Sequence, residues 1–375
     1  MKKDWQKKKL DEVCEVEYGT RVVQKRDGGT IYPVYGGGGA TFSMDSFNRE
    51  DRVVVARFGM SEQCTRFVAG KFFLNDSGLT LSPKNSDTLL PTFLDKWLFS
   101  GNDEIFAIGK GTAQKNLDVA AFRCLQVPQP PLPEQKRIVD ILDKAFAAIS
   151  TAKANAEKNL QNARELFESY LQDVFANAGD GWEEKKLNDV CEVKDGTHYS
   201  PQYVPEGIPF VTQKNITENG LDISNTKRIS LADHESFYKR SNVFQGDIII
   251  SMIGANRGMA CLVNESTTFS IKNVGLVKAN PKVNQDYLLY FLKSPKAKEY
   301  VSTYSKGGAQ EFIGLTELRK FPVLLATLPE QKRIVAKLDA LSSETKKLEA
   351  IYQQKIADLE ELKKSVLQKA FNGGL

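Results

Sequence analysis

Two short glycine-flanked segments carry residue types that can contact nucleic acids. Glutamine side chains can pair with adenine edges, and lysine side chains can bind phosphate or guanine. The residues concerned are Lys110, Thr112, Gln114 and Lys115 in the first segment, and Lys306 and Gln310 at the matching place in the second. Because the two segments resemble each other, we favour a role in positioning a nucleic-acid backbone, or a purely structural loop, over base reading.

A second group of candidate contacts differs between the two halves of the chain, as residues that read different sequences should. Arg21 follows Gly19-Thr20, whereas Gly196 is followed by Thr197, His198 and Tyr199. Another polar stretch contains Gln213 and Lys214, and turns at Gly59 and Gly254 are flanked by Arg57 and Arg257. We predict nucleic-acid contacts for this group, with ordinary solvated loops as the alternative.

The sequence predicts no catalytic residue, metal ligand or cofactor site in this chain. Its 5 cysteines form no CxxC pair and only 2 histidines occur, which disfavours a zinc site and is typical of reduced, mostly buried thiols. No phosphate-binding GxxxxGK[ST] loop is present. Gln129-Pro130-Pro131-Leu132 lacks both end residues of the turn that holds the amino group in adenine methyltransferases. Glu134-Gln135-Lys136 resembles half of a nuclease motif, but we interpret it as the start of a helix.

Composition is that of an ordinary globular protein, with 41% hydrophobic and 26% charged residues and a net charge of +4. No long uncharged apolar stretch occurs, and the polar start lacks the apolar core of a signal peptide, so we expect a cytoplasmic protein with no membrane segment. This charge alone does not indicate DNA binding. If the chain binds DNA, folding must gather its basic residues on one face.

The whole chain is organised as an internal repeat. Residues 5–20 (WQKKKLDEVCEVEYGT) and 182–197 (WEEKKLNDVCEVKDGT) agree at ten of sixteen positions. Residues 132–143 (LPEQKRIVDILD) and 328–339 (LPEQKRIVAKLD) agree at ten of twelve. The two offsets differ, so length varies inside the globular parts while the flanks keep their register. This pattern indicates a fixed scaffold that carries two related modules with different surfaces.

Each LPEQKR is followed by a seam of apolar residues at alternating steps of three and four, which predicts a long helix. The predicted seam comprises Ile138, Leu142, Ile149, Leu160 and Leu166 in the first copy, and Ile334, Leu338, Leu348, Ile356, Leu359 and Leu362 in the second. Thr345 is the only clearly polar residue on this track. Each helix would extend about 60 Å, at about 1.5 Å per residue, and so needs a partner along its length.

The predicted fold is therefore mixed α/β, with two globular modules and two long helices related by an internal pseudo-two-fold repeat. We place the modules at residues 1–131 and 180–327, and the helices at 132–179 and 328–375. Buried strands are expected at 53–55 and 248–250, helical structure around 284–301, and a strand-like opening segment in each module. The short linker before Trp182 favours an antiparallel coiled coil, although a parallel pair remains possible.

The sequence resembles the specificity subunits of type I restriction–modification systems. The residues that carry the resemblance are the two LPEQKRIV motifs, the segments at 110–114 and 306–310, DGTHYSP at 195–201, GIPFVTQKNI at 207–216 and the LQKAFNGGL ending. The resemblance covers essentially the whole chain, and two such motifs at this spacing form a specific signal.

The resemblance implies that the modules are target recognition domains that each read one half of a bipartite double-stranded DNA site. It also implies that the helices act as a spacer and dock two methyltransferase subunits. DNA methylation, with S-adenosylmethionine, and ATP- and Mg²⁺-dependent translocation and cleavage would belong to the methyltransferase and restriction subunits. The alternative is a coiled-coil scaffold that joins two protein-binding modules without DNA.

Overall fold

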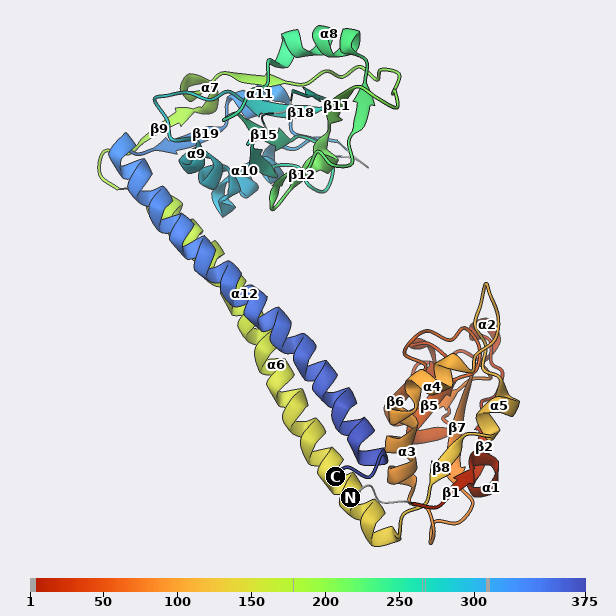
Figure 1. Ribbon diagram of the computed structural model, residues 1–375. Coiled ribbons are helices and arrows are strands. Elements are labelled where there is room, and N and C mark those ends of the chain that lie inside the picture. The colour runs from red at the N-terminus through yellow and green to blue at the C-terminus, as the bar shows by residue number, and fades with distance from the viewer. Residues whose placement is uncertain (1–4, 178, 265, 267, 308–310) are drawn as a thin grey trace. The chain divides into compact units, whose positions relative to one another are not determined.

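The computed structural model describes residues 5–177, 179–264, 266, 268–307 and 311–375 (Figure 1). The chain forms two compact units, Met1–Glu157 with Gln353–Leu375, and Lys158–Tyr352. Each unit therefore contains one module together with part of each long helix. We call them unit 1 and unit 2 and describe each by itself.

Unit 1 is built on a six-stranded sheet with the order β2-β7-β5-β6-β3-β4. Its strands are β2 (Cys14–Tyr18), β3 (Tyr32–Tyr35), β4 (Ala40–Met44), β5 (Arg49–Ala56), β6 (Thr65–Leu74) and β7 (Gly78–Pro83). A separate antiparallel pair joins β1 (Lys7–Lys9) to β8 (Gln126–Pro128). The helices of the module are α1 (Leu10–Val13), α2 (Gln24–Asp27), α3 (Pro91–Ser100), α4 (Asn102–Ala107) and α5 (Val119–Arg123).

Unit 2 divides its strands among smaller sheets. The order β10-β18-β15-β16 comprises β10 (Val193–Asp195), β18 (Val274–Val277), β15 (Ile248–Ser251) and β16 (Ala260–Leu262). The order β14-β11-β17 comprises β14 (Lys227–Ile229), β11 (Ile208–Val211) and β17 (Ser270–Ile271). Two pairs join β12 (Ile216–Thr217) to β13 (Gly220–Leu221) and β9 (Glu183–Lys186) to β19 (Pro322–Leu325).

The remaining short helices of unit 2 are α7 (Leu187–Val190), η1 (Gln213–Asn215), α8 (Leu231–Ser241), α9 (Gln285–Lys293), α10 (Pro295–Tyr304) and α11 (Leu315–Arg319). The predicted helical region around 284–301 is thus two helices. The break falls at Ser294-Pro295, because a proline disfavours helical geometry in the residue before it and has no N–H to continue the ladder.

The two modules have the same strand pairing, although their sequences match only at the edges. Strand β2 pairs with β7 as β10 pairs with β18, and β5 lies between β7 and β6 as β15 lies between β18 and β16. The parallel pair β3–β6 corresponds to the parallel pair β11–β17, and the antiparallel pair β3–β4 to β11–β14. The continuous β6 of unit 1 thus corresponds to β16 and β17 of unit 2. The internal repeat found in the sequence is therefore also a repeat of the strand topology.

The opening segment of each module is not one strand, as the sequence predicted, but two strands separated by a helical turn. In unit 1 the turn is α1, and in unit 2 it is α7. The reason is tertiary: Leu10 and Leu187 are fully buried, and their amides donate to the carbonyl oxygens of Leu125 and Phe321, 2.8 Å away. The turn therefore anchors a buried leucine in each core.

The Gly-Thr pair that ends this segment allows a close backbone approach. A Cβ atom at Gly19 would lie 1.8 Å from the Asn75 carbonyl oxygen, and one at Gly196 would lie 2.3 Å from that of Ile271. The following threonine amides donate to Leu74 O and Ile271 O at 2.9 and 3.0 Å. Only glycine fits in both places, which explains why this pair is repeated.

Both predicted long helices are confirmed, as α6 (Leu132–Ala176) and α12 (Leu328–Phe371). Their pairing is antiparallel within each unit. In unit 1, Arg137 Nη2 donates to Leu375 O at 2.9 Å, and Lys153 forms an ion pair with Glu360. In unit 2, Arg164 Nε lies 3.1 Å from Glu349 Oε2, and Trp182 Nε1 donates to Glu330 Oε2 at 3.2 Å. In both units, residue numbers therefore rise along α6 in the direction in which they fall along α12.

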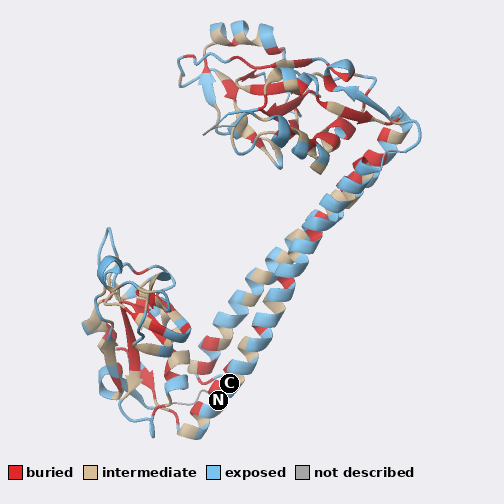
Figure 2. Ribbon diagram, turned by 180° about the vertical axis from the view of Figure 1, so that it is seen from behind, coloured by how far each residue is buried: buried red, intermediate tan, exposed pale blue. Residues whose placement is uncertain are grey.

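The buried residues of the helices, coloured red in Figure 2, follow the predicted seam near the start of each helix and depart from it further along. Ile138, Leu142, Ile149, Ile334 and Leu338 are buried, and Leu160, Ile356 and Leu359 are half-buried. The other three predicted positions, Leu166, Leu348 and Leu362, are exposed. Beyond Leu160 on α6, Ala163 is buried as the spacing predicts, and the other buried residues are Leu171 and Phe175.

The departure has a geometric cause. A straight α-helix drifts by about 20° per heptad relative to a repeat of 3.5 residues, so a seam extrapolated over several heptads leaves the contact face. Near the end of α6 the buried residues are Leu171 and Phe175, one position beyond Tyr170 and Val174, which continue the 3.5-residue spacing and are half-buried. Thr345 stays inside, with 3% of its surface exposed, because its hydroxyl donates to Leu341 O at 2.9 Å.

Candidate nucleic-acid interface

A buried glutamine in each LPEQKR motif fastens a long helix to its module. Gln135 is fully buried, its Nε2 donates to Thr88 O at 2.9 Å and Pro130 O at 2.8 Å, and its Oε1 accepts from Leu90 N at 2.8 Å. Gln331 repeats the arrangement, with donation to Ala326 O at 2.8 Å and acceptance from Asn284 N at 2.9 Å. Leu90 and Asn284 are the N-caps of α3 and α9. The sequence analysis noticed this motif without finding the role of its glutamine.

The neighbouring charges of the motif are used within the helix. Arg137 Nε lies 2.7 Å from Glu134 Oε2, and Arg333 Nη2 lies 3.3 Å from Glu330 Oε1. Both are (i, i+3) pairs on the helix surface, so the repeated arginine already faces a carboxylate.

The first glycine-flanked segment forms a small hairpin beside the end of β5. Lys110 and Asn116 exchange backbone hydrogen bonds of 2.8 Å, and Met60 N donates to Lys115 O at 2.8 Å. Lys110 forms an ion pair with Asp118 at 2.5 Å, and Lys115 Nζ lies 3.7 Å from the centre of the Phe106 ring. Thr112 and Gln114 are exposed, and the Gln114 amide lies beside Gly59. The segment presents these two polar side chains on a fixed backbone.

The corresponding segment of unit 2 is described only in part. Lys306 is exposed and exchanges backbone hydrogen bonds of 2.8 Å with Phe312. Gln310 lies outside the described residues. Arg257 is engaged internally, because it forms an ion pair with Glu311 and its Nε donates to Ser305 Oγ at 3.0 Å. Its guanidinium group thus contacts both Ser305 and Glu311.

Arg57, which flanks the Gly59 turn in unit 1, is held by aromatic rings rather than by a carboxylate. Its guanidinium carbon lies 4.9 Å from the centre of the Tyr18 ring and 4.6 Å from that of Phe58. Arg21, two residues after Gly19, is exposed. Both arginines thus belong to the loops around the ends of β2 and β5.

In unit 2 the Gly-Thr pair leads into a chain of polar contacts. The buried Asp195 carboxylate receives two hydrogen bonds from Arg240, at 2.9 and 2.8 Å, and lies 3.1 Å from His198 Nε2. The other ring nitrogen of His198 lies 2.7 Å from Asn273 Oδ1. Thr197 Oγ1 accepts from Tyr199 N at 3.1 Å, and the Tyr199 ring is exposed. His198 is thereby fixed between Asp195 and Asn273.

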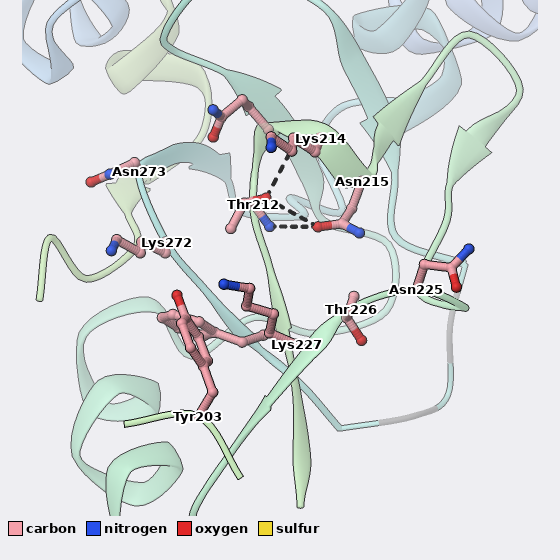
Figure 3. A pocket seen from close by; sticks show the side chains of 11 residues that line it. Tyr203, Thr212, Lys214, Asn215, Asn225, Thr226, Lys227, Lys272 and Asn273 are labelled. Carbon is pink, nitrogen blue, oxygen red and sulfur yellow. Dashed lines mark hydrogen bonds between the residues drawn. The ribbon is translucent and has the colours of Figure 1, made fainter. Parts of the chain in front are cut away.

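Beside this chain lies a hollow of about 470 Å³ at one edge of the three-stranded sheet (Figure 3). Strands β11 and β17 are parallel, so they end at the same edge, and the antiparallel β14 begins there. The residues that follow or precede these strand ends are thereby brought together. The lining residues are Tyr203, Phe210, Thr212, Gln213, Lys214, Asn215, Asn225, Thr226, Lys227, Lys272 and Asn273. We call this the lysine–amide hollow.

The side chains of the lysine–amide hollow divide into structural and available groups. Asn215 is structural, because its Oδ1 accepts from Thr212 N at 2.9 Å and its Nδ2 donates to Asp222 O at 3.0 Å. Gln213 and Asn225 have no side-chain hydrogen-bond partner among the described residues. Lys227 Nζ lies 4.2 Å from the centre of the Tyr203 ring. The two predicted candidates, Gln213 and Lys214, therefore both line this basic, amide-rich surface.

The equivalent sheet edge of unit 1 has different chemistry. There Gly36–Gly39 follow β3, Asn75 follows β6 and β4 begins at Ala40. A Cβ atom added at Gly38 or Gly39 would meet no heavy atom within 4 Å. One module thus presents lysines and amides at this edge, and the other presents an open glycine-rich backbone, so the same fold offers two different surfaces.

Nine lining residues of the hollow were not predicted. Phe210, Thr212 and Asn215 are near neighbours of the two candidates, and the other six are Tyr203, Asn225, Thr226, Lys227, Lys272 and Asn273. Asn273 alone carried a local signal, since it precedes Val274 of a buried strand, and its positive φ of 54° marks a special backbone position. The others come from segments far apart in the chain. Of the described helices, none has the length and apolar composition to cross a membrane, and no group of three or more described acidic, cysteine or histidine side chains is placed to hold a metal.

Comparison with known proteins identifies the family. The model of the type I restriction modification DNA specificity domain matches residues 2–160 and again 179–360. Each match covers one module and the larger part of the long helix that follows it. The chain therefore belongs to the type I restriction modification DNA specificity domain family.

Relatives of this chain carry the same description. It is 26% identical over 309 residues to the specificity subunit of the type I restriction enzyme EcoBI of Escherichia coli, which covers 72% of this chain and 63% of that subunit. It is 21% identical to the EcoDI specificity subunit of Escherichia coli over 99% of this chain and 89% of that subunit. The chain thus spans under two thirds of the EcoBI subunit's length.

Two solved structures show the same fold. A chain from a type I R-M system, solved in a study of its complex assembly and conformational transition, has a TM-score of 0.77, 19% identity and coverage of 99% of this chain and 98% of that one. The HsdS subunit from Thermoanaerobacter tengcongensis has a TM-score of 0.59 and 19% identity, with coverage of 99% and 97%.

Proposed function

We propose that this chain is the DNA specificity subunit of a type I restriction–modification system, and that each module reads one half of a bipartite DNA site. The observation that carries the proposal is the repeat itself. Two domains of one DNA specificity family share six strand pairings and the same glutamine anchor, yet differ at the sheet edge after β3 and β11. Two modules that share a fold but differ in surface chemistry are suited to a DNA site whose two halves have different sequences.

In this proposal the chain is not an enzyme, and the paired helices act as a spacer. A helix of 45 residues extends roughly 65 Å, at about 1.5 Å per residue. That exceeds one helical turn of DNA, about 34 Å, so an unread gap between the half-sites is expected. Two methyltransferase subunits would dock on the helices and use S-adenosylmethionine, and restriction subunits would use ATP and Mg²⁺.

The proposal is tested by co-expression of the chain with the methyltransferase subunit of its system in a host without DNA methylation. Long-read sequencing for N6-methyladenine should find one bipartite motif with a fixed gap, which disappears when this chain is omitted. Exchange of residues 180–327 for another module should change only one half of the motif. A change in both halves would contradict the assignment of one half-site to each module.

A coiled-coil scaffold without DNA is the alternative function, and salt dependence separates the two. DNA binding through phosphates weakens steeply as salt rises, with a slope of about −0.9 per phosphate contact in a plot of log affinity against log salt. A scaffold would form its protein complex and show no DNA affinity to weaken. No motif despite a stable complex would favour the scaffold.

A further inference from the structure

We infer that unit 2 contacts DNA at the lysine–amide hollow, where Lys214, Lys227 and Lys272 bind backbone phosphates and Gln213, Asn225 and Asn273 face base edges. The inference rests on the proposed function as a DNA reader. The inference adds to the proposed function in two ways. It places the DNA contact at one sheet edge, and it assigns phosphate binding to lysines and base contacts to side-chain amides.

The charge of the hollow supports the phosphate contacts. Three of its eleven lining residues are lysines, and none of the described lining residues is acidic. By contrast, Lys110 faces Asp118 and Arg257 faces Glu311. Ammonium groups gathered without a compensating acid create a local positive potential, which attracts phosphate.

The position of Lys227 shows how one of these ammonium groups is directed. It lies over the face of the Tyr203 ring, at 4.2 Å from its centre, and Figure 3 shows both side chains within the hollow. A cation over an aromatic face is held by the ring's quadrupole and keeps its N–H donors for other partners. Lys272 donates to Ser200 Oγ, which likewise holds it beside the hollow without neutralising it.

The amides supply the second kind of contact. The side-chain oxygen and NH₂ group of Gln213 and Asn225 are unbonded among the described residues, so each offers one acceptor and two donors. A glutamine or asparagine amide in this state can pair with N6 and N7 of adenine in the major groove. Because both the Oδ1 and the Nδ2 of Asn215 are engaged inside the module, we exclude this residue from the readers.

Asn273 is the amide whose direction the fold controls most closely. Its backbone has a φ of 54°, and its amide N–H donates to Thr197 O at 3.2 Å. Its Oδ1 contacts His198, which contacts Asp195, which in turn is held by Arg240. This leaves Nδ2 directed by three other side chains and without a partner among the described residues. His198 and Asp195 are therefore positioning residues for Asn273.

The first half of the test measures DNA affinity of the full chain in complex with its methyltransferase subunits, on DNA with and without its motif. Lys227→Gln and Lys272→Gln should weaken binding to both DNAs by the same factor, and each should reduce the salt slope by about 1. Lys185→Gln in β9 is the matched control, because it removes the same charge from an exposed lysine outside the hollow. Thermal unfolding of each variant shows whether it is folded.

The second half measures sequence preference by long-read methylation sequencing. Gln213→Ala and Asn273→Gly should relax one position of the half-site read by unit 2, by about tenfold, and leave the other half-site unchanged. Glycine is chosen at 273 because it accepts the positive φ without strain. The half-site read by unit 1 thus serves as an internal control in every experiment.

The outcomes separate this inference from the proposed function. If the wild-type complex has a bipartite motif but the lysine variants bind like Lys185→Gln, or the amide variants keep the full motif, the hollow is not the contact site and the inference is wrong. If the wild-type complex binds no DNA, the proposed function fails and the inference fails with it.

Discussion

Replacement of the buried Gln135 by leucine should destabilise unit 1 specifically. The variant Gln135→Leu keeps the approximate volume of the side chain but removes both polar atoms. It leaves the Leu90 amide and the carbonyl oxygens of Thr88 and Pro130 without the partners that lie 2.8–2.9 Å away in the wild type. The start of α3 would then lose the bonds that attach it to α6.

The magnitude follows from the number of groups left unpaired. An unsatisfied buried polar group costs about 1–3 kcal/mol, and an unpaired amide is more costly than a carbonyl with a second lone pair available to water. For one amide and two carbonyls we expect a loss of about 3–5 kcal/mol. The equivalent Gln331→Leu leaves one amide and one carbonyl, and we expect about 2–4 kcal/mol in unit 2.

Hydrogen–deuterium exchange of the full chain, read by mass spectrometry, measures the two units separately. Gln135→Leu should accelerate exchange in peptides that contain Leu90 and leave those that contain Asn284 unchanged, and Gln331→Leu should do the reverse. Gln161→Leu is the control on α6, because that glutamine is exposed and bonds only Glu165 on the same helix, at 2.7 Å. Equal exchange in Gln135→Leu and Gln161→Leu would refute the anchoring role.

Three further variants test the burial assigned to particular residues. Burial raises the pKa of the Asp95 carboxyl to about 6, so its ionisation lowers the stability as pH rises from about 4 to about 6, and Asp95→Asn should gain up to about 3 kcal/mol over the wild type at pH 8 and little at about pH 3.5 in urea unfolding. Leu359→Glu should destabilise the helix pair by about 2 kcal/mol, whereas Leu362→Glu, on an exposed position one turn later, should cost under about 0.5 kcal/mol. Equal losses would contradict the observed track. Gly196→Ala should cost more than about 3 kcal/mol, because its Cβ would lie 2.3 Å from Ile271 O, and a thermal midpoint like that of the wild type would disprove the close approach.

The helices, strands and repeat that depend on a local residue pattern could be predicted from the sequence alone. The LPEQKR motifs, with proline and an acidic residue in the first turn, and the apolar steps of three and four that follow them sufficed to predict α6 and α12. The repeat predicted two related modules, and the buried runs at 53–55 and 248–250 predicted β5 and β15. These features are encoded within a few turns or strands of the chain, so no tertiary information was needed.

Contacts between segments that are far apart in the chain became known only from the fold. Lys227 and Lys272 carried no signal in the sequence, and they lie beside the predicted Lys214 because β11 pairs in parallel with β17 and antiparallel with β14. The buried track on α6 shifts by one position because helix rotation accumulates over its length. The role of Gln135 depends on a contact with Leu90, 45 residues away. Each of these outcomes rests on contacts between distant segments, which no local pattern records.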